Sequence, residues 1–167
     1  ALIHAGVENI CQVKIKWIDT EKLEKNTNQI DKYFEDIDGI IIPGGFGDRG
    51  IEGKILSSKY AREKNIPFLG ICLGLQCAII DFSRHICGFK NANSTEFKSR
   101  IKYPVIDLMN KQKKIRTKGA TMRLGSYPCK VKRGTNAHIA YGKNKISERH
   151  RHRYEVNNKY IKKLEKK

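Results

Sequence analysis

The stretch IPFLGICLGLQ, residues 66–76, decides the fold, because an apolar strand-like run changes there into a helix-like one. Residues 66–71 have the composition of a buried strand, and residues 73–82 are apolar all round, as in an enclosed helix. Cys72 lies at the turn between two glycines, Gly70 and Gly74, which permit close packing and tight backbone angles. Such a turn leaves a cysteine beside free N–H groups at a helix N-terminus, where thiolate is favoured over thiol. The pattern predicts a nucleophile elbow, and a buried structural cysteine is the alternative.

A glycine-rich loop precedes this turn. Residues 39–43, GIIIP, form a short β-branched strand that runs into GGFGDRG, residues 44–50. A phosphate-binding loop at Gly53-Lys54 is excluded, since Asp48 and Ile55 stand where that motif needs Gly and Ser or Thr. The loop therefore predicts an oxyanion hole, with a plain turn as the alternative.

Five ordered motifs resemble segments of the glutamine amidotransferase domain of CTP synthases, a triad-type (class I) amidotransferase family. They are PGGFG (43–47), GICLG with Gln76 (70–76), NANSTEF (91–97), TMRLG (121–125) and ERHRHRYEVN (148–157). The first two fit several triad amidotransferases, whereas the last three are more specific to this family. The resemblance extends from residue 1 to about residue 163, and it implies one amidotransferase domain over residues 1–167 that is incomplete at its C-terminus.

The resemblance implies a role for each matching residue. Cys72 corresponds to the nucleophile that attacks the side-chain amide of glutamine, releases ammonia and leaves a glutamyl thioester. Gly45 and Leu73 correspond to the oxyanion-hole donors. A carboxylate such as Glu96 suits the α-ammonium group of glutamine, and a guanidinium such as Arg153 suits its α-carboxylate; a solvated carboxylate and an exposed arginine are the alternatives. The expected glutamine-contacting positions are Leu73, Gly74, Leu75, Gln76, Glu96 and Arg153.

The catalytic base of that family is not found among these residues. Its triad ends in a His-x-Glu pair near the C-terminus, and no histidine follows His152. His85 lies about 20 Å along the predicted helix from Cys72. His150 and His152 alternate with arginines, so in a strand they point away from the face of Arg153. We therefore expect little steady glutaminase activity from residues 1–167, whether the chain is shortened, only partly ordered or degenerate.

Charge and cysteine usage exclude several other classes of protein. The chain has 34 Lys and Arg against 17 Asp and Glu, a net charge of +17, but the charge is scattered and accompanies no nucleic-acid recognition motif. Five cysteines without a CxxC pair argue against a zinc site or a disulfide framework and favour a reducing cytoplasm. No apolar run could span a bilayer. We expect neither nucleic acid nor a membrane as a partner.

The resemblance also implies partners. L-glutamine is the expected substrate, with no cofactor or metal in this domain. Ammonia would pass to an N-terminal synthetase domain of the same polypeptide, where ATP, Mg and UTP bind, with GTP as an activator and a homotetramer as the full assembly. Two alternatives remain: another triad amidotransferase, such as one serving GMP synthesis, or a catalytically dead amidotransferase-like module used for binding.

The alternation of strands and helices predicts an α/β fold with a doubly wound, mostly parallel sheet flanked by helices and the site at the carboxyl ends of the strands. Additional strands are expected in the C-terminal half. Val13, Ile15 and Trp17 are expected to point inward from an N-terminal strand. The expected helices are 1–9, 31–38, 51–65, 73–88 and 158–167; the strands are 11–19, 40–43, 66–71, 103–109, 121–131 and 149–156; a disordered loop covers 110–119.

Overall fold

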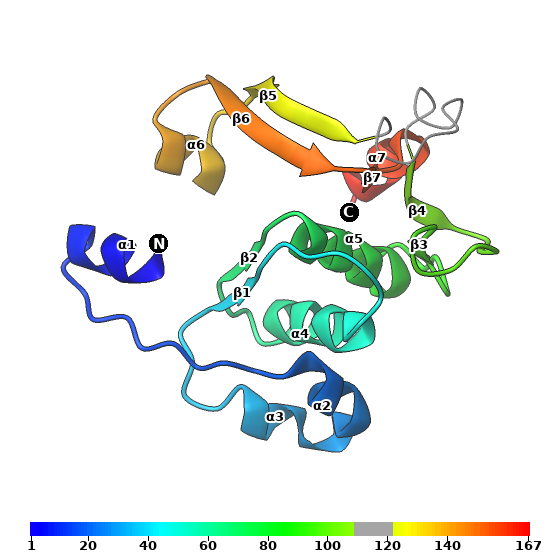
Figure 1. The fold of residues 1–167 in the computed structure, drawn as a ribbon, viewed down its shortest axis with the longest axis horizontal. Helices are drawn as coiled ribbons and strands as arrows, with labels where there is room; N and C mark the ends of the chain where they lie inside the picture. Colours follow the sequence, from blue (N-terminus) through cyan, green and yellow to red (C-terminus); the bar gives the residue numbers. More distant parts are fainter. Residues whose placement is uncertain (109–121) are drawn as a thin grey trace.

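The computed structural model describes residues 1–108 and 122–167, and it confirms the α/β class. Strand and helix alternate as expected through the N-terminal half, in β1 (Ile40–Ile42), α4 (Ile51–Glu63), β2 (Phe68–Gly70) and α5 (Leu73–His85). β1 and β2 pair in parallel, with Ile40 beside Phe68 and Ile42 beside Gly70 (Figure 1). Because the two strands are parallel, the glycine-rich loop after β1 and the turn at Cys72 after β2 leave the sheet at the same edge.

Two apolar clusters enclose α4 and α5. The first joins α4 and α5 to β4 (Pro104–Leu108) and contains buried residues such as Ile55, Ile80 and Val105. The second joins β1 and α4 to α2 (Thr20–Lys25), whose Leu23 is fully buried. The turn at Cys72 therefore begins a helix that the core holds along its length.

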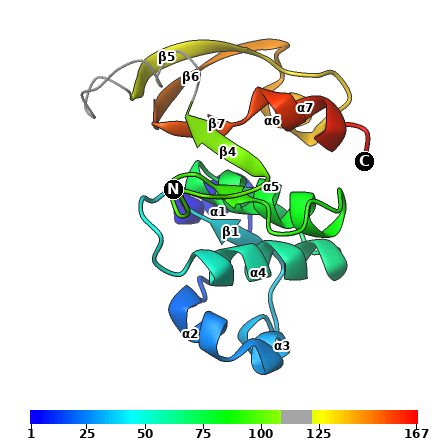
Figure 2. The ribbon, with the colours of Figure 1, turned by 90° about the vertical axis from the view of Figure 1, so that its right-hand side faces the viewer.

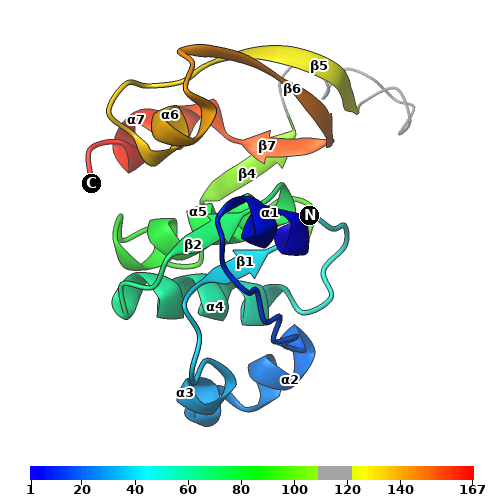
Figure 3. The same ribbon diagram turned by 90° about the vertical axis from the view of Figure 1, so that its left-hand side faces the viewer.

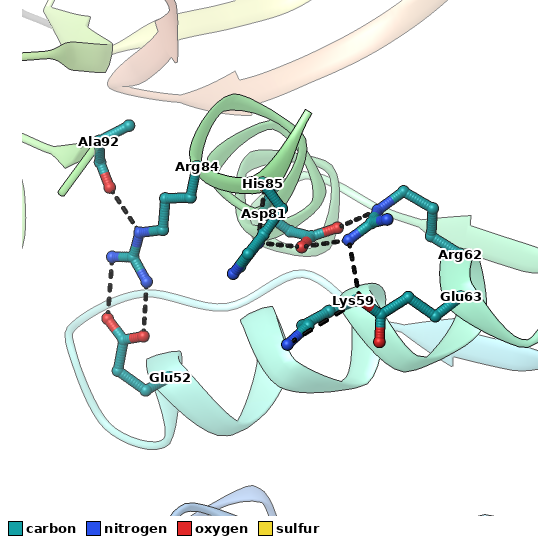
Figure 4. A network of polar contacts seen from close by, with 8 residues as sticks. All are labelled: Glu52, Lys59, Arg62, Glu63, Asp81, Arg84, His85 and Ala92. Carbon is teal, nitrogen blue, oxygen red and sulfur yellow. Dashed lines mark hydrogen bonds and ion pairs between the residues drawn. The ribbon is translucent and has the colours of Figure 1, made fainter. Parts of the chain in front are cut away.

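Polar contacts add a clamp between α4 and α5 (Figure 4). Asp81 is 1% exposed, accepts two hydrogen bonds from Arg62 at 3.0 and 3.2 Å and lies 2.8 Å from Nδ1 of His85. Arg84 donates to both carboxylate oxygens of Glu52 at 2.6 and 3.0 Å. Since buried charge is costly unless it is paired, this clamp fixes how the two helices face each other.

The C-terminal half carries the additional strands that the sequence predicts. β3 (Asn93–Ser94) runs parallel to β4, and β4 pairs antiparallel with β7 (Tyr154–Val156). β5 (Arg123–Lys130) and β6 (Lys145–His152) form an antiparallel hairpin on the side of the molecule remote from α4 (Figures 1 and 2). No residue of β5 or β6 is buried. Two helices complete this half, α6 (Asn136–Tyr141) and α7 (Asn158–Leu164), the second as predicted.

Two predictions about strands are corrected. Residues 149–156 are not one strand, because β6 ends at His152, β7 begins at Tyr154, and Arg153 between them belongs to neither strand. Residues 11–19 form no strand: the segment is extended between α1 (Leu2–Glu8) and α2 (Figure 3), and Trp17 is 87% exposed. The alternating pattern was misleading because a strand also needs a neighbouring strand for its backbone hydrogen bonds, and the described residues place none beside this segment.

The remaining expectations concern short segments. The helix predicted over 31–38 is shorter than expected: α3 (Ile30–Tyr33), which follows a 3₁₀ turn (Thr27–Gln29), covers only its beginning, whereas α2 and α6 were not predicted. The predicted disordered loop at 110–119 lies outside the described residues.

Candidate active site

The turn at Cys72 has the strained geometry of a nucleophile elbow. β2 ends at Gly70, α5 begins at Leu73, and Cys72 between them has φ 52° and ψ −105°. A non-glycine residue in such a conformation costs on the order of 1–3 kcal/mol, so it persists only where the surrounding structure enforces it. The thiol is partly exposed rather than buried.

Steric contact at two glycines enforces this turn. A Cβ atom on Gly74 would lie 2.1 Å from the carbonyl oxygen of Ile42, and one on Gly70 would lie 2.6 Å from the backbone of Gly74. Both glycines are therefore needed for the close approach of β1, β2 and α5, as the sequence predicts. Cys72 therefore immediately precedes α5, whose first turn packs closely against β1 and β2.

The glycine-rich loop lies against the elbow. A Cβ atom on Gly44 would be 3.4 Å from Cβ of Cys72, and one on Gly45 would be 3.2 Å from the Leu73 side chain. Within residues 1–108 and 122–167, the N–H groups of Gly45 and Leu73 donate to no backbone acceptor. Two free donors thus lie close to the thiol, which is the arrangement that stabilises an oxyanion.

One small cavity, about 40 Å³, gathers most of the predicted site residues. Leu73, Gly74 and Leu75 do not line it: Leu73 is in the core, Gly74 packs on β1, and the Leu75 side chain is 49% exposed. A volume of this size holds water-sized groups, so glutamine would also need the space now taken by exposed side chains at the rim, such as Phe46. The lining residues are Gly45, Phe46, Cys72, Gln76, Glu96, His152, Arg153 and Tyr154.

Glu96 supplies a carboxylate with few partners. Its Oε1 accepts a hydrogen bond from the Gly47 N–H at 3.3 Å. Burial raises the pKa of Glu96, and the Gly47 N–H and the charge of Arg153 offset this rise only in part. A cation bound beside Glu96 would stabilise the ionised form.

Gln76 and Arg153 offer unused hydrogen-bonding groups at the same cavity. The Gln76 Nε2 donates to the carbonyl oxygen of Tyr154 at 2.9 Å, which ties α5 to β7, while its Oε1 is buried without a partner among the described residues. In the same part of the chain, Nε of Arg153 is also buried without a hydrogen-bond partner. An acceptor and a guanidinium are therefore available to a ligand.

His152 also lines the cavity, and here the sequence prediction is wrong. Strict alternation along one strand would turn His152 away from the face of Arg153. The break at Arg153 ends that alternation, so His152, Arg153 and Tyr154 all contribute to the lining. No glycine or proline in residues 148–157 marks the break. Phe46 and Tyr154 also line the cavity, and no pattern in the sequence gave a reason to expect either of them there.

Other candidate sites are less suited to nucleophilic chemistry. A larger cavity of about 330 Å³ is lined by Glu52, Arg84, Asn91, Asn93 and Lys98, but it has no nucleophile and its arginine is paired with Glu52. Among the described residues, no cluster of His, Cys, Asp and Glu could hold a metal ion. None of the helices in that part of the chain is long and apolar enough to cross a bilayer.

Comparisons with known proteins agree with this geometry. A model of the family "Glutamine amidotransferase class-I" matches residues 1–167. The chain is 57% identical over 169 residues to a CTP synthase of Methanocaldococcus jannaschii, covering 99% of this chain and 31% of that protein. It is 56% identical over 166 residues to a CTP synthase of Cytophaga hutchinsonii, covering 99% of this chain and 30% of that protein.

A solved structure is also similar. It is described as Trypanosoma brucei CTPS, glutaminase domain with bound acivicin, and superposes with a TM-score of 0.89 at 38% identity, covering 98% of this chain and 62% of that one. The chain spans less than a third of the length of the CTP synthases of Methanocaldococcus jannaschii and Cytophaga hutchinsonii.

Proposed function

The chain belongs to the class-I glutamine amidotransferases, and from this membership we propose that it is the glutamine-hydrolysing part of a CTP synthase. The observation that carries the proposal is the cavity where Cys72, Glu96 and Arg153 meet, since each offers the chemistry that one end of glutamine requires. Two free N–H groups beside the thiol support the same assignment.

Glutamine would bind through its two α-substituents. The ammonium group pairs with the Glu96 carboxylate, and the unpartnered Oε1 of Gln76 accepts one further hydrogen bond. The α-carboxylate pairs with the Arg153 guanidinium, which has donors to spare. These contacts leave the side-chain amide directed along the cavity toward Cys72.

The reaction would then proceed by covalent catalysis. The Cys72 thiolate attacks the carbonyl carbon of the side-chain amide, and the N–H groups of Gly45 and Leu73 stabilise the oxyanion that forms. The C–N bond breaks as the nitrogen takes up a proton and leaves as ammonia. Water hydrolyses the resulting thioester to glutamate and the free thiol.

Proton transfer needs a group that the described cavity does not offer. His152 is the histidine that lines it: its Nε2 shares a hydrogen bond with Nδ1 of His150 at 3.0 Å, and its Nδ1 is buried 3.4 Å from Oε1 of Glu155 without a hydrogen bond between them. A positioned acid or base typically contributes 10²–10⁴-fold to such a reaction. We therefore expect residues 1–167 to bind glutamine and form a covalent adduct with slow turnover.

In the whole protein, the ammonia would aminate UTP to CTP in an ATP-dependent synthetase domain. This part of the proposal rests on the two CTP synthases to which the chain is similar. Replacing Cys72 in the whole protein should abolish CTP synthesis from glutamine. The same variant should still synthesise CTP from free ammonia.

Covalent labelling tests the glutamine site directly. A glutamine-like chloroketone should modify Cys72 before the other cysteines, and free glutamine should slow the reaction. Cys11 and Cys129 are exposed, so they serve as internal controls for reagent access, and Cys72→Ser should remove the label. Burial raises the pKa of Cys77 to about 12, so this thiol should stay unmodified. Equal labelling of Cys72 and Cys129, or no protection by glutamine, would contradict the proposal.

A further inference from the structure

Five side chains from three strands form a closed ring of contacts next to the cavity. Arg123 lies over the ring of Tyr127 at 4.1 Å, and Tyr127 meets the edge of His150 at 5.2 Å between ring centroids. Nδ1 of His150 lies 3.0 Å from Nε2 of His152, and Nδ1 of His152 lies 3.4 Å from Oε1 of Glu155. The Arg123 guanidinium donates to Oε2 of Glu155 at 2.9 Å, which closes the ring.

The contacts of the ring restrict the protonation of its two histidines. A hydrogen bond between two imidazoles needs one donor and one acceptor, so both rings cannot be fully protonated while it exists, and the tautomers decide which nitrogen donates. Arg123 donates to Oε2 of Glu155, and Oε1 of Glu155 lies 3.4 Å from Nδ1 of His152 without a hydrogen bond between them. Burial favours the neutral form of His152 by lowering its pKa.

His152 stands at the point where Arg153 leaves the sheet. It is the last residue of β6, Arg153 follows it, and β7 begins at Tyr154. No residue of β5 or β6 is buried, so apolar packing holds the break only from the β7 side, where Tyr154 and Val156 pack against the core. On the β6 side, the ring of polar and aromatic contacts joins β5, β6 and β7.

We propose that His152 is a positioning residue of the glutamine site, which holds the break between β6 and β7 so that Arg153 reaches the α-carboxylate of glutamine. The inference rests on the proposed function and deepens it. His152 takes no proton from Cys72 in this proposal, because its Nε2 is held by His150 and its Nδ1 is buried 3.4 Å from Oε1 of Glu155. It acts on substrate affinity and leaves the reactivity of the thiol unchanged.

Labelling kinetics separate these two effects. For the 167-residue chain, the half-saturating concentration of the chloroketone reports the glutamine site, while the rate with iodoacetamide reports Cys72 alone. His152→Ala should raise the half-saturating concentration about tenfold and leave both the maximal rate and the iodoacetamide rate at Cys72 unchanged. His152→Asn keeps a polar side chain that can hydrogen-bond to His150, and it should restore most of the affinity. His4→Ala, at an exposed position on α1, is the matched control and should change nothing.

Each outcome decides something. An unchanged half-saturating concentration in His152→Ala, or a parallel fall in the iodoacetamide rate, would overturn the positioning role. Absence of saturation in the unaltered chain would contradict the proposed glutamine site itself, so the two failures are distinguishable. A ¹⁵N nuclear magnetic resonance spectrum at pH 7 should show one protonated and one unprotonated nitrogen in the pair formed by Nδ1 of His150 and Nε2 of His152, and two protonated nitrogens there would equally overturn the inference.

Discussion

The two halves of the site are held in different ways. The elbow region, β1, β2, α4 and α5, places Cys72 and the N–H groups by close backbone contact and a buried apolar core. The hairpin region, β5, β6 and β7, has no buried residue in its two long strands and places Arg153 and His152 through polar side-chain contacts. A packed core is destabilised by changes in side-chain volume, whereas polar contacts are weakened by changes in charge or in hydrogen-bond geometry.

This difference suggests that the elbow region positions the reacting atoms and that the hairpin region binds the substrate. The reacting atoms need fixed positions, and a packed core provides these because it does not deform continuously. Substrate-binding side chains must admit and release a ligand, and a solvent-exposed hairpin can shift with little loss of packing. Substitutions in the elbow region should therefore act on stability, and those in the hairpin region on glutamine affinity.

Gly74→Ala should give the largest effect. The new methyl group would meet the Ile42 carbonyl at 2.1 Å, so β1 or α5 must move. Such overpacking costs about 3 kcal/mol, and a thermal scan should show the midpoint lower by about 6–12 °C with loss of Cys72 labelling. Gly39→Ala is the control, because its methyl group would meet nothing closer than 3.4 Å. Equal stability of the two variants would contradict the account of the elbow.

Asp81→Asn tests the clamp between α4 and α5 (Figure 4). The change removes the charge that pairs with Arg62 and His85, at a residue that is 1% exposed. The free energy of unfolding measured in urea should therefore fall by about 2 kcal/mol. The half-saturating concentration of the chloroketone should stay the same. Glu63→Gln, at a half-exposed ion pair, should cost about 0.5 kcal/mol or less. A change in glutamine affinity without a change in stability would reverse the proposed division.

Arg153→Ala should produce the opposite pattern. Loss of a charged hydrogen bond of about 1.5–3 kcal/mol predicts glutamine binding that is weaker by about ten- to a hundredfold, with little change in the thermal midpoint. Isothermal titration of glutamine into the Cys72→Ser chain measures this without turnover. Arg151→Ala, two residues earlier in the chain and exposed, is the control. If both variants bind equally, Arg153 does not contact the carboxylate.

The pH dependence of binding should give the smallest effect. Only ionised Glu96 attracts the ammonium group, and burial raises the pKa of Glu96. Affinity should therefore fall severalfold as the pH drops through this raised pKa, at a higher pH than for an ordinary carboxylate. Glu96→Gln should bind more weakly and lose this dependence. A variant that retains the same pH profile would assign the titration to another group, with His152 the first to examine.

Much of the elbow could be predicted from the sequence. Glycines on both sides of Cys72, between two apolar runs, specify a close strand-to-helix turn, and local spacing alone carries that information. The strand predicted at residues 11–19 is wrong because pairing depends on a partner strand that the segment itself cannot specify. His152 was misplaced because the break at Arg153 has no glycine or proline to announce it.

The sequence by itself determined the family, the α/β class and the choice of Cys72 as the proposed nucleophile, since motifs and apolar periodicity are local properties of the chain. Only the tertiary structure decided which side chains share the cavity with Cys72. Gln76, Glu96 and Arg153 come from separate elements, and the structure brings them together with His152. Contacts between residues that are far apart along the chain arise from packing and polar pairing in three dimensions, so no local pattern could have specified the ring around His152.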